Sequence, residues 1–239
     1  MLTEELHYHI CHLKWVPHLL NSTQKVARVE LSKSLLNTLQ KARHQSYMYF
    51  YTGDESWFYL STDYEIQWVS QGEKPYIREK KIIDSKKFMS TIFLNTQGFL
   101  VVDVLPEGQN FNGEYFIQNI LKKIYEKTAH LRKNEQRKIT LHFDNARPHT
   151  SRKVMDYMSI HHMKRAPHPA FSPDIAISDF SLFGYVKDQL KGKTFESADS
   201  LLDEVTEILS KIPLDALKHV FLEWETRLLK VIDSDGEFS

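Results

Sequence analysis

The sequence predicts an α/β fold in which a mixed central sheet is flanked by helices. Alternating or wholly apolar runs predict strands near 47–54, 87–94, 99–105 and 139–144. Apolar residues at helical spacing predict helices near 22–39, 115–125, 152–159, 179–190, 201–209 and 217–228. Consecutive strands followed by alternating helices and a further strand indicate mixed strand pairing.

Length and composition are typical of one large domain, or of one domain with appendages. The chain has 239 residues, 41% of them hydrophobic, which suffices for a substantial core. Only residues 234–239 look disordered. The single cysteine, Cys11, excludes an internal disulfide and fits a reducing compartment. No apolar run reaches the length of a membrane span, so we expect a soluble protein.

The first strong candidate for a functional residue is Asp144. Ile139, Leu141 and Phe143 alternate with polar residues, which predicts a strand that ends at Asp144 before the break at Pro148. A carboxylate at the carboxyl end of a buried strand lies where α/β sheets place their chemistry. Taken alone, Asp144 is equally well interpreted as a cap of the following helix.

Two further aspartates have comparable positions. The apolar run 47–53 leads into Asp54, and Asp179 lies where the proline-containing loop 165–177 becomes a helix. We expect the strands of Asp54 and Asp144 to lie side by side, with both carboxylates at one edge of the sheet. The helix that begins at Asp179 would close the site.

Three converging carboxylates favour metal-dependent chemistry. Like charges at contact distance cannot all remain ionised without a proton or a cation. Oxygen ligands suit Mg²⁺ or Mn²⁺, and two such ions about 3.5–4 Å apart can promote phosphoryl transfer. The sequence contains no phosphate-binding loop and no His-Glu-x-x-His helix that would indicate another chemistry. The histidine-rich stretch 7–12 is not expected to bind zinc, because no second ligand pair follows at zinc-finger spacing.

The charge distribution is uneven although the net charge is zero. Residues 196–239 contain 11 acidic and 4 basic residues, a balance of −7, so the remainder carries +7. Basic residues concentrate in 74–87 and 122–138. Such runs are usually solvated faces, and they are also what contact with DNA phosphates requires.

Three blocks of the sequence closely resemble the catalytic blocks of mariner-type transposases: Thr52–Trp57, His142–His149 and Pro167–Phe183. Trp15–His18 resembles the linker motif of that family, and Lys191–Phe195 the segment after its third block. The blocks occur in the family's order. Thirty-four residues separate the second and third aspartates, which is the spacing of mariner-type enzymes.

The resemblance implies a ribonuclease H-like fold of the DDE/DDD transposase and integrase type. It implies that Asp54, Asp144 and Asp179 bind two Mg²⁺ or Mn²⁺ ions and are catalytic. The activity implied is that of a DNA endonuclease and strand transferase, which cleaves transposon ends and joins them to TA target DNA. Asp174 is not assigned as a ligand; a turn or cap role is expected for it.

Further roles follow from the same resemblance. Asn145, Arg147 and His149 would support the metal ligands or contact DNA, and a structural turn role is equally open for Arg147. Residues 1–45 would form a helical linker and dimerisation segment, and 46–239 the catalytic domain. The dimer would be a homodimer formed through the linker residues Trp15, Val16, Pro17 and His18, and through a clamp loop at 68–81. DNA as substrate implies a nuclear protein.

Three departures from the family pattern lead to further expectations. The two helix-turn-helix modules that precede the family's linker are missing from this chain, so specific DNA recognition should be weak. Leu19 replaces the usual linker glutamate, which should weaken a dimer. Ile177 stands where a proline is usual, which should free the loop before Asp179.

Two alternative functions remain open. The chain could be a non-catalytic, domesticated or truncated remnant that binds DNA or a protein. It could also be a ribonuclease H-like nuclease acting on RNA–DNA hybrids, although the linker and the aspartate spacing speak against this.

Overall fold

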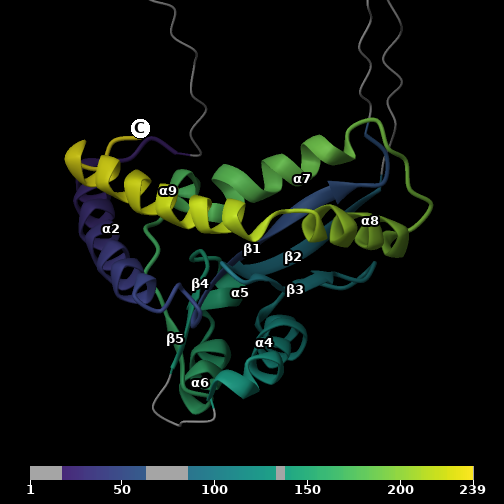
Figure 1. Ribbon diagram of the computed structural model, residues 1–239, viewed down its shortest axis with the longest axis horizontal. Coiled ribbons are helices and arrows are strands. Elements are labelled where there is room, and N and C mark those ends of the chain that lie inside the picture. Colours follow the sequence, from purple (N-terminus) through teal and green to yellow (C-terminus); the bar gives the residue numbers. More distant parts are fainter. Residues whose placement is uncertain (1–17, 63–85, 133–137, 239) are drawn as a thin grey trace, which may run out of the picture.

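The computed structural model describes residues 18–62, 86–132 and 138–238. Its centre is a five-stranded sheet with the order β3-β2-β1-β4-β5 and helices on both faces (Figure 1). The strands are β1 Phe50–Tyr59, β2 Lys87–Asn95, β3 Gly98–Val104, β4 Ile139–His142 and β5 Met163–Arg165. β1, β2 and β3 pair antiparallel, whereas β4 pairs parallel with β1 and with β5. The predicted α/β class with mixed pairing is therefore confirmed.

The helical elements follow the predicted order. They are α2 Ser22–Arg43, α3 Gly113–Tyr115, η1 Phe116–Leu121, α4 Lys122–Lys127, η2 Ala129–Arg132, α5 Arg147–Thr150, α6 Arg152–Ile160, η3 Pro173–Ile175, η4 Ser178–Leu182, α7 Phe183–Leu190, α8 Ala198–Ser210 and α9 Leu214–Asp233. None of the described helices is long and apolar enough to cross a membrane.

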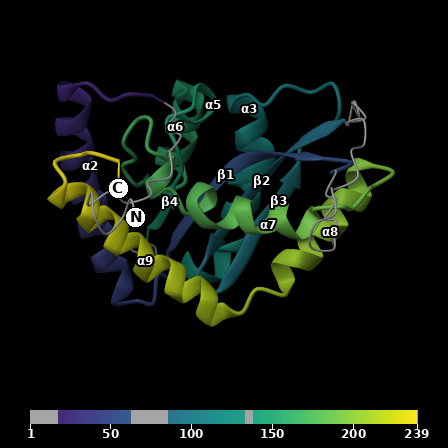
Figure 2. The ribbon, with the colours of Figure 1, turned by 90° about the horizontal axis from the view of Figure 1, so that it is seen from above.

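Alternation along the strands produces two apolar cores. Phe50 and Leu94 point to one face of the sheet and pack with α2, α7, α8 and α9. Tyr51 and Phe93 point to the other face and pack with η1, α4 and α6. Figures 1 and 2 show the sheet between these two layers of helices. Both faces of β1 are thus covered, which is why its sequence is apolar on both sides.

Helix α2 lies within the segment predicted as a linker and is part of the first core. Leu35 and Leu39 on α2 are fully buried, and the helix packs along α9 (Figure 2). Its N-cap is Asn21 in a capping box with Gln24, directly before the predicted start of the helix at residue 22. The division into two domains at residue 45 remains a prediction. The linker residues Trp15, Val16 and Pro17, the histidine-rich stretch 7–12 and the clamp loop 68–81 lie outside the described residues.

The C-terminal residues that looked disordered pack against α2 as far as residue 238. Glu237 forms an ion pair with Lys25, and the Arg28 guanidinium lies 4.7 Å from the centre of the Phe238 ring. Gly236, at φ +85°, approaches the Lys25 backbone so closely that a Cβ atom would lie 2.6 Å from its carbonyl oxygen. These contacts tie the chain end to the start of α2, so the expectation of disorder was wrong for residues 234–238.

Candidate active site

The strand register places Asp54 and Asp144 side by side. β1 and β4 run parallel with Thr52 opposite His142, and Asp54 and Asp144 each follow two residues later. The sequence predicts a strand that ends at Asp144, whereas β4 ends at His142 and Asp144 lies two residues beyond it. Asp54 does not lie at a strand end, because β1 continues along β2 to Tyr59. The prediction of its position was therefore wrong in detail, although the two aspartates do meet at the edge where β4 ends.

Gly53 allows the close approach of β1 and β2 immediately before Asp54. A Cβ atom at this position would lie 2.4 Å from Cγ of Phe93 and 2.5 Å from the carbonyl oxygen of Ile92. No side chain fits at such distances without moving the neighbouring strand. The glycine in the Thr-Gly-Asp block is thus explained by packing next to the candidate site.

Asp179 comes from the opposite direction, in the first turn of η4. Its backbone N–H donates to the carbonyl of Ala176 at 3.0 Å. The preceding loop is held in place, because Ile177 is 1% exposed in the core and the Trp224 indole donates to the carbonyl of Ile175 at 2.7 Å. The expectation that Ile177 frees this loop stays a prediction, although the Ile177 side chain is packed in the core.

Asp174, five residues before Asp179, has a role that the sequence did not reveal. Both its carboxylate oxygens accept hydrogen bonds from the Arg28 guanidinium, at 2.9 and 2.5 Å. Arg28 lies on α2 and its side chain is only 1% exposed. The turn role expected for Asp174 is present in η3, and the side chain additionally joins this loop to α2.

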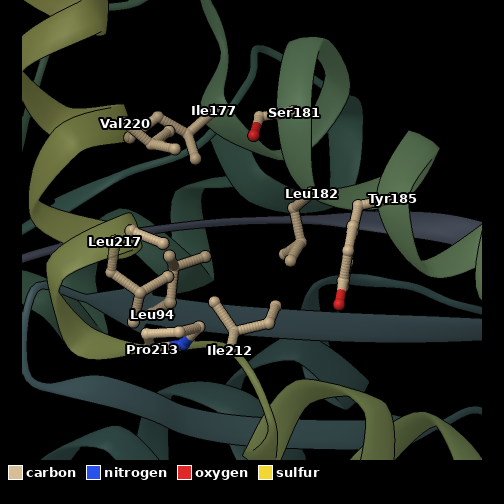
Figure 3. A pocket seen from close by; sticks show the side chains of 10 residues that line it. Leu94, Ile177, Ser181, Leu182, Tyr185, Ile212, Pro213, Leu217 and Val220 are labelled. Atoms are coloured by element: carbon tan, nitrogen blue, oxygen red, sulfur yellow. The ribbon is translucent and has the colours of Figure 1, made fainter.

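The three aspartates line one cavity of about 460 Å³. The other lining residues are Asn145, Ala146, His168, Pro169, Ala170, Phe171, Ser172 and Pro173. A second cavity of about 190 Å³ lies between η4 and α9 and is lined almost entirely by apolar side chains such as Leu182 and Leu217 (Figure 3). No acidic side chain lines that second cavity, so the carboxylate cavity is the candidate active site.

The three carboxylates differ in their tendency to ionise. Burial and then the charge of the adjacent Glu55 raise the pKa of Asp54 well above its ordinary value, and the other two aspartates act in the same direction. Burial and the charge of Asp144 raise the pKa of Asp179 to about 6. For Asp144 burial also acts upward, but hydrogen bonds from His149 and from a backbone N–H outweigh it and lower the pKa. Asp144 is thus the most readily ionised of the three carboxylates.

A buried histidine connects Asp144 with Glu55. His149 is completely buried; its Nδ1 lies 2.8 Å from Asp144 Oδ1. Its Nε2 forms an ion pair with Glu55 Oε2 at 3.1 Å, without the alignment of a hydrogen bond. Burial would lower the pKa of His149, but the two carboxylates outweigh it and raise the pKa to about 10. His149 is therefore a cation between two anions, and its burial favours the predicted role of supporting Asp144 over contact with DNA.

Two further histidines, His142 and His168, form a neutral pair beside the cavity. The Thr52 hydroxyl lies 2.9 Å from Nδ1 of His142, whose Nε2 lies 3.0 Å from Nδ1 of His168. Burial lowers the pKa of His142 well below its ordinary value and that of His168 to about 4. These rings therefore form a polar contact between β1, β4 and the cavity wall without adding positive charge.

Arg165 at the end of β5 holds the backbone around Asp144. Its Nη2 donates to the Asp144 carbonyl at 2.9 Å and to Asn145 Oδ1 at 2.6 Å, and its guanidinium lies 5.1 Å from the centre of the Phe143 ring. The Asn145 amide also donates to the carbonyl of His168 at 2.8 Å. Asn145 thus ties the strand end to the cavity wall. β5 and Arg165 were both missed from the sequence, because a three-residue strand has too short a pattern to detect.

The remaining predicted residues lie around the rim. Arg147 is exposed at the start of α5, where either predicted role, DNA contact or turn formation, is open to it. The Asp144 carboxylate accepts the N–H of Ala146, which is the N-cap of α5. The alternative interpretation of Asp144 was a cap of the following helix. Its side chain does stabilise the turn before that helix. His18 is described, and its ring lies 4.6 Å from that of Phe171 at the cavity wall.

The donor atoms of the cavity suit a hard divalent cation. Three carboxylates contribute oxygen ligands, and burial together with the neighbouring acids raises the pKa of Asp54 and of Asp179, so a cation there would stabilise their charged forms. Within the described ranges, no three acidic, histidine or cysteine side chains already surround a common point.

Comparison with known proteins shows that the chain is similar to transposases. A family profile described as "Transposase (partial DDE domain)" matches residues 59–140. The Mos1 mariner transposase of Drosophila mauritiana is 31% identical over 199 residues, which are 80% of this chain and 56% of Mos1. The histone-lysine N-methyltransferase SETMAR of Homo sapiens is 29% identical over 229 residues, which are 94% of this chain and 33% of SETMAR. The chain thus spans between a third and just over half of these relatives.

The structural comparisons agree. The crystal structure of the Mos1 catalytic domain matches with a TM-score of 0.72 at 25% identity, covering 94% of this chain and 100% of that domain. The Mos1 paired-end complex with the left transposon end matches with a TM-score of 0.84 at 23% identity, covering 99% of this chain and 69% of the Mos1 chain. The fold is that of a ribonuclease H-like domain of the DDE/DDD transposase and integrase type. Within that class the chain is related to the mariner-type transposases, and its fold is that of their catalytic domain.

Proposed function

We propose that the chain is a metal-dependent DNA endonuclease and strand transferase of the mariner type. The observation that carries the proposal is the convergence of Asp54, Asp144 and Asp179 on one cavity from three separate elements. Burial and the neighbouring acids raise the pKa of Asp54 and of Asp179, and a bound cation would offset both effects, which supports the proposal.

In this proposal Asp54, Asp144 and Asp179 are the catalytic residues and hold two Mg²⁺ or Mn²⁺ ions. Bound ions of this kind activate a water or a 3′-hydroxyl and stabilise the leaving oxygen of a phosphodiester. His149 keeps Asp144 ionised and oriented, and Arg165 keeps the backbone of Asp144 in place. Mos1 structures with Mn and with Mg support this choice of ions.

The proposed substrate is DNA, first at transposon ends and then at TA target sites. Mos1 structures include a paired-end complex and a strand transfer complex, which supports this substrate. We further propose a homodimer formed through the linker residues 15–18 and the loop 68–81. A nuclear location follows from DNA as substrate and from the eukaryotic sources of the relatives.

The proposal is tested by incubating the protein with nicked duplex DNA and Mn²⁺, alongside Asp144→Asn. Wild type should cleave the DNA only with the metal, and Asp144→Asn should abolish cleavage. Asp156→Asn is the matched control, because Asp156 is an exposed acid on α6 that forms an ion pair with Arg152 and does not line the cavity. It should cleave like wild type.

The other outcomes identify the alternatives. Equal DNA binding by wild type and Asp144→Asn, without cleavage by either, would support the non-catalytic remnant. Preferential cleavage of RNA–DNA hybrids would support the other nuclease. Affinity should fall steeply with salt, with a log–log slope of about −0.9 for each phosphate neutralised.

A further inference from the structure

Phe171 is an exposed aromatic residue on the wall of the candidate active site. Its side chain is 47% exposed, although it lines the carboxylate cavity. Among the described residues that line this cavity, it is the large apolar side chain that remains exposed. A ring of this size normally gains from burial, so its exposure beside the candidate active site needs an explanation.

The backbone of Phe171 is held in an unfavourable conformation. Its φ of +55° is in the left-handed region, which a bulky residue rarely adopts. Adjacent contacts hold it there: Ser172 is 1% exposed and its hydroxyl donates to the carbonyl of Ala170 at 2.9 Å. The ring also packs at a tilt of 43° against His18. Strain of this kind persists where the surroundings impose it, and it concentrates at functional sites.

The cavity has two chemically different parts. One part presents the carboxylates of Asp54, Asp144 and Asp179, and the other is an uncharged wall that includes Pro169 and Phe171. A nucleotide is divided in the same way, into an anionic phosphate and a flat base with apolar faces. A phosphate bound through cations at the aspartates would place its base near the uncharged wall.

We propose that Phe171 stacks on the DNA base next to the scissile phosphate. The proposal rests on the proposed function, because that function places the phosphate at the carboxylates. Loss of one aromatic platform for a base weakens binding by roughly 5- to 150-fold. Stacking of this type is tolerant of sequence, so Phe171 positions the strand and does not read a base pair.

The test combines protein variants with DNA that lacks single bases. Phe171→Gly removes the ring but adopts a positive φ without strain. The backbone conformation is therefore kept, and only the contribution of the ring is tested. Phe171→Asn does the same with a residue that also tolerates this region. Phe171→Trp keeps an aromatic ring. Leu229→Ala is the control, because Leu229 on α9 is 45% exposed and does not line the cavity.

Affinity is measured on a nicked duplex with Ca²⁺, with abasic sites placed one at a time on either side of the nick. For at least one position, removal of the base should weaken DNA binding by wild type roughly 5- to 150-fold. Phe171→Gly and Phe171→Asn should bind intact DNA about as weakly as wild type binds the abasic DNA. Removing the base should then weaken their binding little further. Phe171→Trp should retain the wild-type response, and Leu229→Ala should match wild type.

Wild-type affinity in the folded glycine and asparagine variants would overturn the proposal. The proposal would also fail if the losses of affinity caused by a Phe171 variant and by an abasic site multiplied at every position tested. Such independent effects mean that the ring and the base do not touch. Failure of the proposed function looks different: wild type would then not nick the same DNA with Mn²⁺.

Discussion

The ion pair between Arg28 and Asp174 makes a quantitative prediction about how the third carboxylate is held. The pair joins α2 to the loop before Asp179, with two hydrogen bonds of 2.9 and 2.5 Å. Arg28 is 1% and Asp174 22% exposed. Removal of one partner from a buried pair costs about 3–5 kcal/mol, because the other charge remains without compensation.

The two single variants should differ because the two groups differ in burial. Asp174→Asn should cost about 3–5 kcal/mol, since it leaves a buried guanidinium whose Nε already lacks a partner. Arg28→Met should cost less, about 2–3 kcal/mol, because methionine fills most of the volume and Asp174 can be hydrated. The double variant should be more stable than Asp174→Asn alone.

The assay is urea denaturation of wild type, both single variants and the double variant at pH 7, followed by circular dichroism. We expect a coupling energy of at least about 1.5 kcal/mol between the two positions. Lys25→Met is the control on the same helix; it removes an exposed ion pair with Glu237 and should cost no more than about 1 kcal/mol. Additivity of Arg28→Met and Asp174→Asn within about 0.5 kcal/mol would refute the reasoning.

Three further predictions concern the site itself. Gly53→Ala should destabilise the protein by about 1–3 kcal/mol, because the new methyl group meets Phe93; an unchanged urea midpoint would contradict this packing. Asp179 has a raised pKa of about 6, so its protonation stabilises the fold below pH 3.8 and this stabilisation is lost as the pH rises through 6. Asp179 is only partly withdrawn from solvent, so solvent screening limits the effect to about 1 kcal/mol. In wild type, Mn²⁺ should therefore raise the melting temperature more at pH 8 than at pH 5. Asp179→Asn should lose most of this difference. An equal rise in the wild-type melting temperature at both pH values would count against the site. His149 has a raised pKa of about 10, so its stabilising charge is fully present below pH 6.5 and is lost as the pH rises through 10. His149→Gln should thus cost about 2–4 kcal/mol at pH 7 and less at pH 10, as measured by urea denaturation, whereas a cost independent of pH would refute a charged histidine.

The proximity of Asp54 and Asp144 could be predicted because strand patterns are local. Two apolar runs that each lead into an aspartate are visible in the sequence, and parallel pairing brings such positions together. The extent of β1 beyond Asp54 could not be predicted in the same way. It depends on the antiparallel partner β2, which continues to pair after β4 has ended.

The supporting contacts were not predictable, because they join residues far apart in the chain. Arg28 looks like one of many basic residues on a helix, and only the folded chain buries it between Asp174 and the ring of Phe238. Glu55 follows Asp54 directly and gives no signal of its own, since its role depends on His149 arriving from α5. The local pattern therefore identifies the acidic residues, whereas the cations that stabilise them emerge only from the tertiary structure.

Calorimetric titration of the protein with Mn²⁺ tests the central claim most directly. Wild type should bind about two ions, and Asp54→Asn, Asp144→Asn and Asp179→Asn should each weaken binding at least about tenfold while the fold is retained. Asp156→Asn should bind as wild type does. Wild-type binding in any one of the three cavity variants, or no binding by the wild-type protein, would contradict a shared cation site.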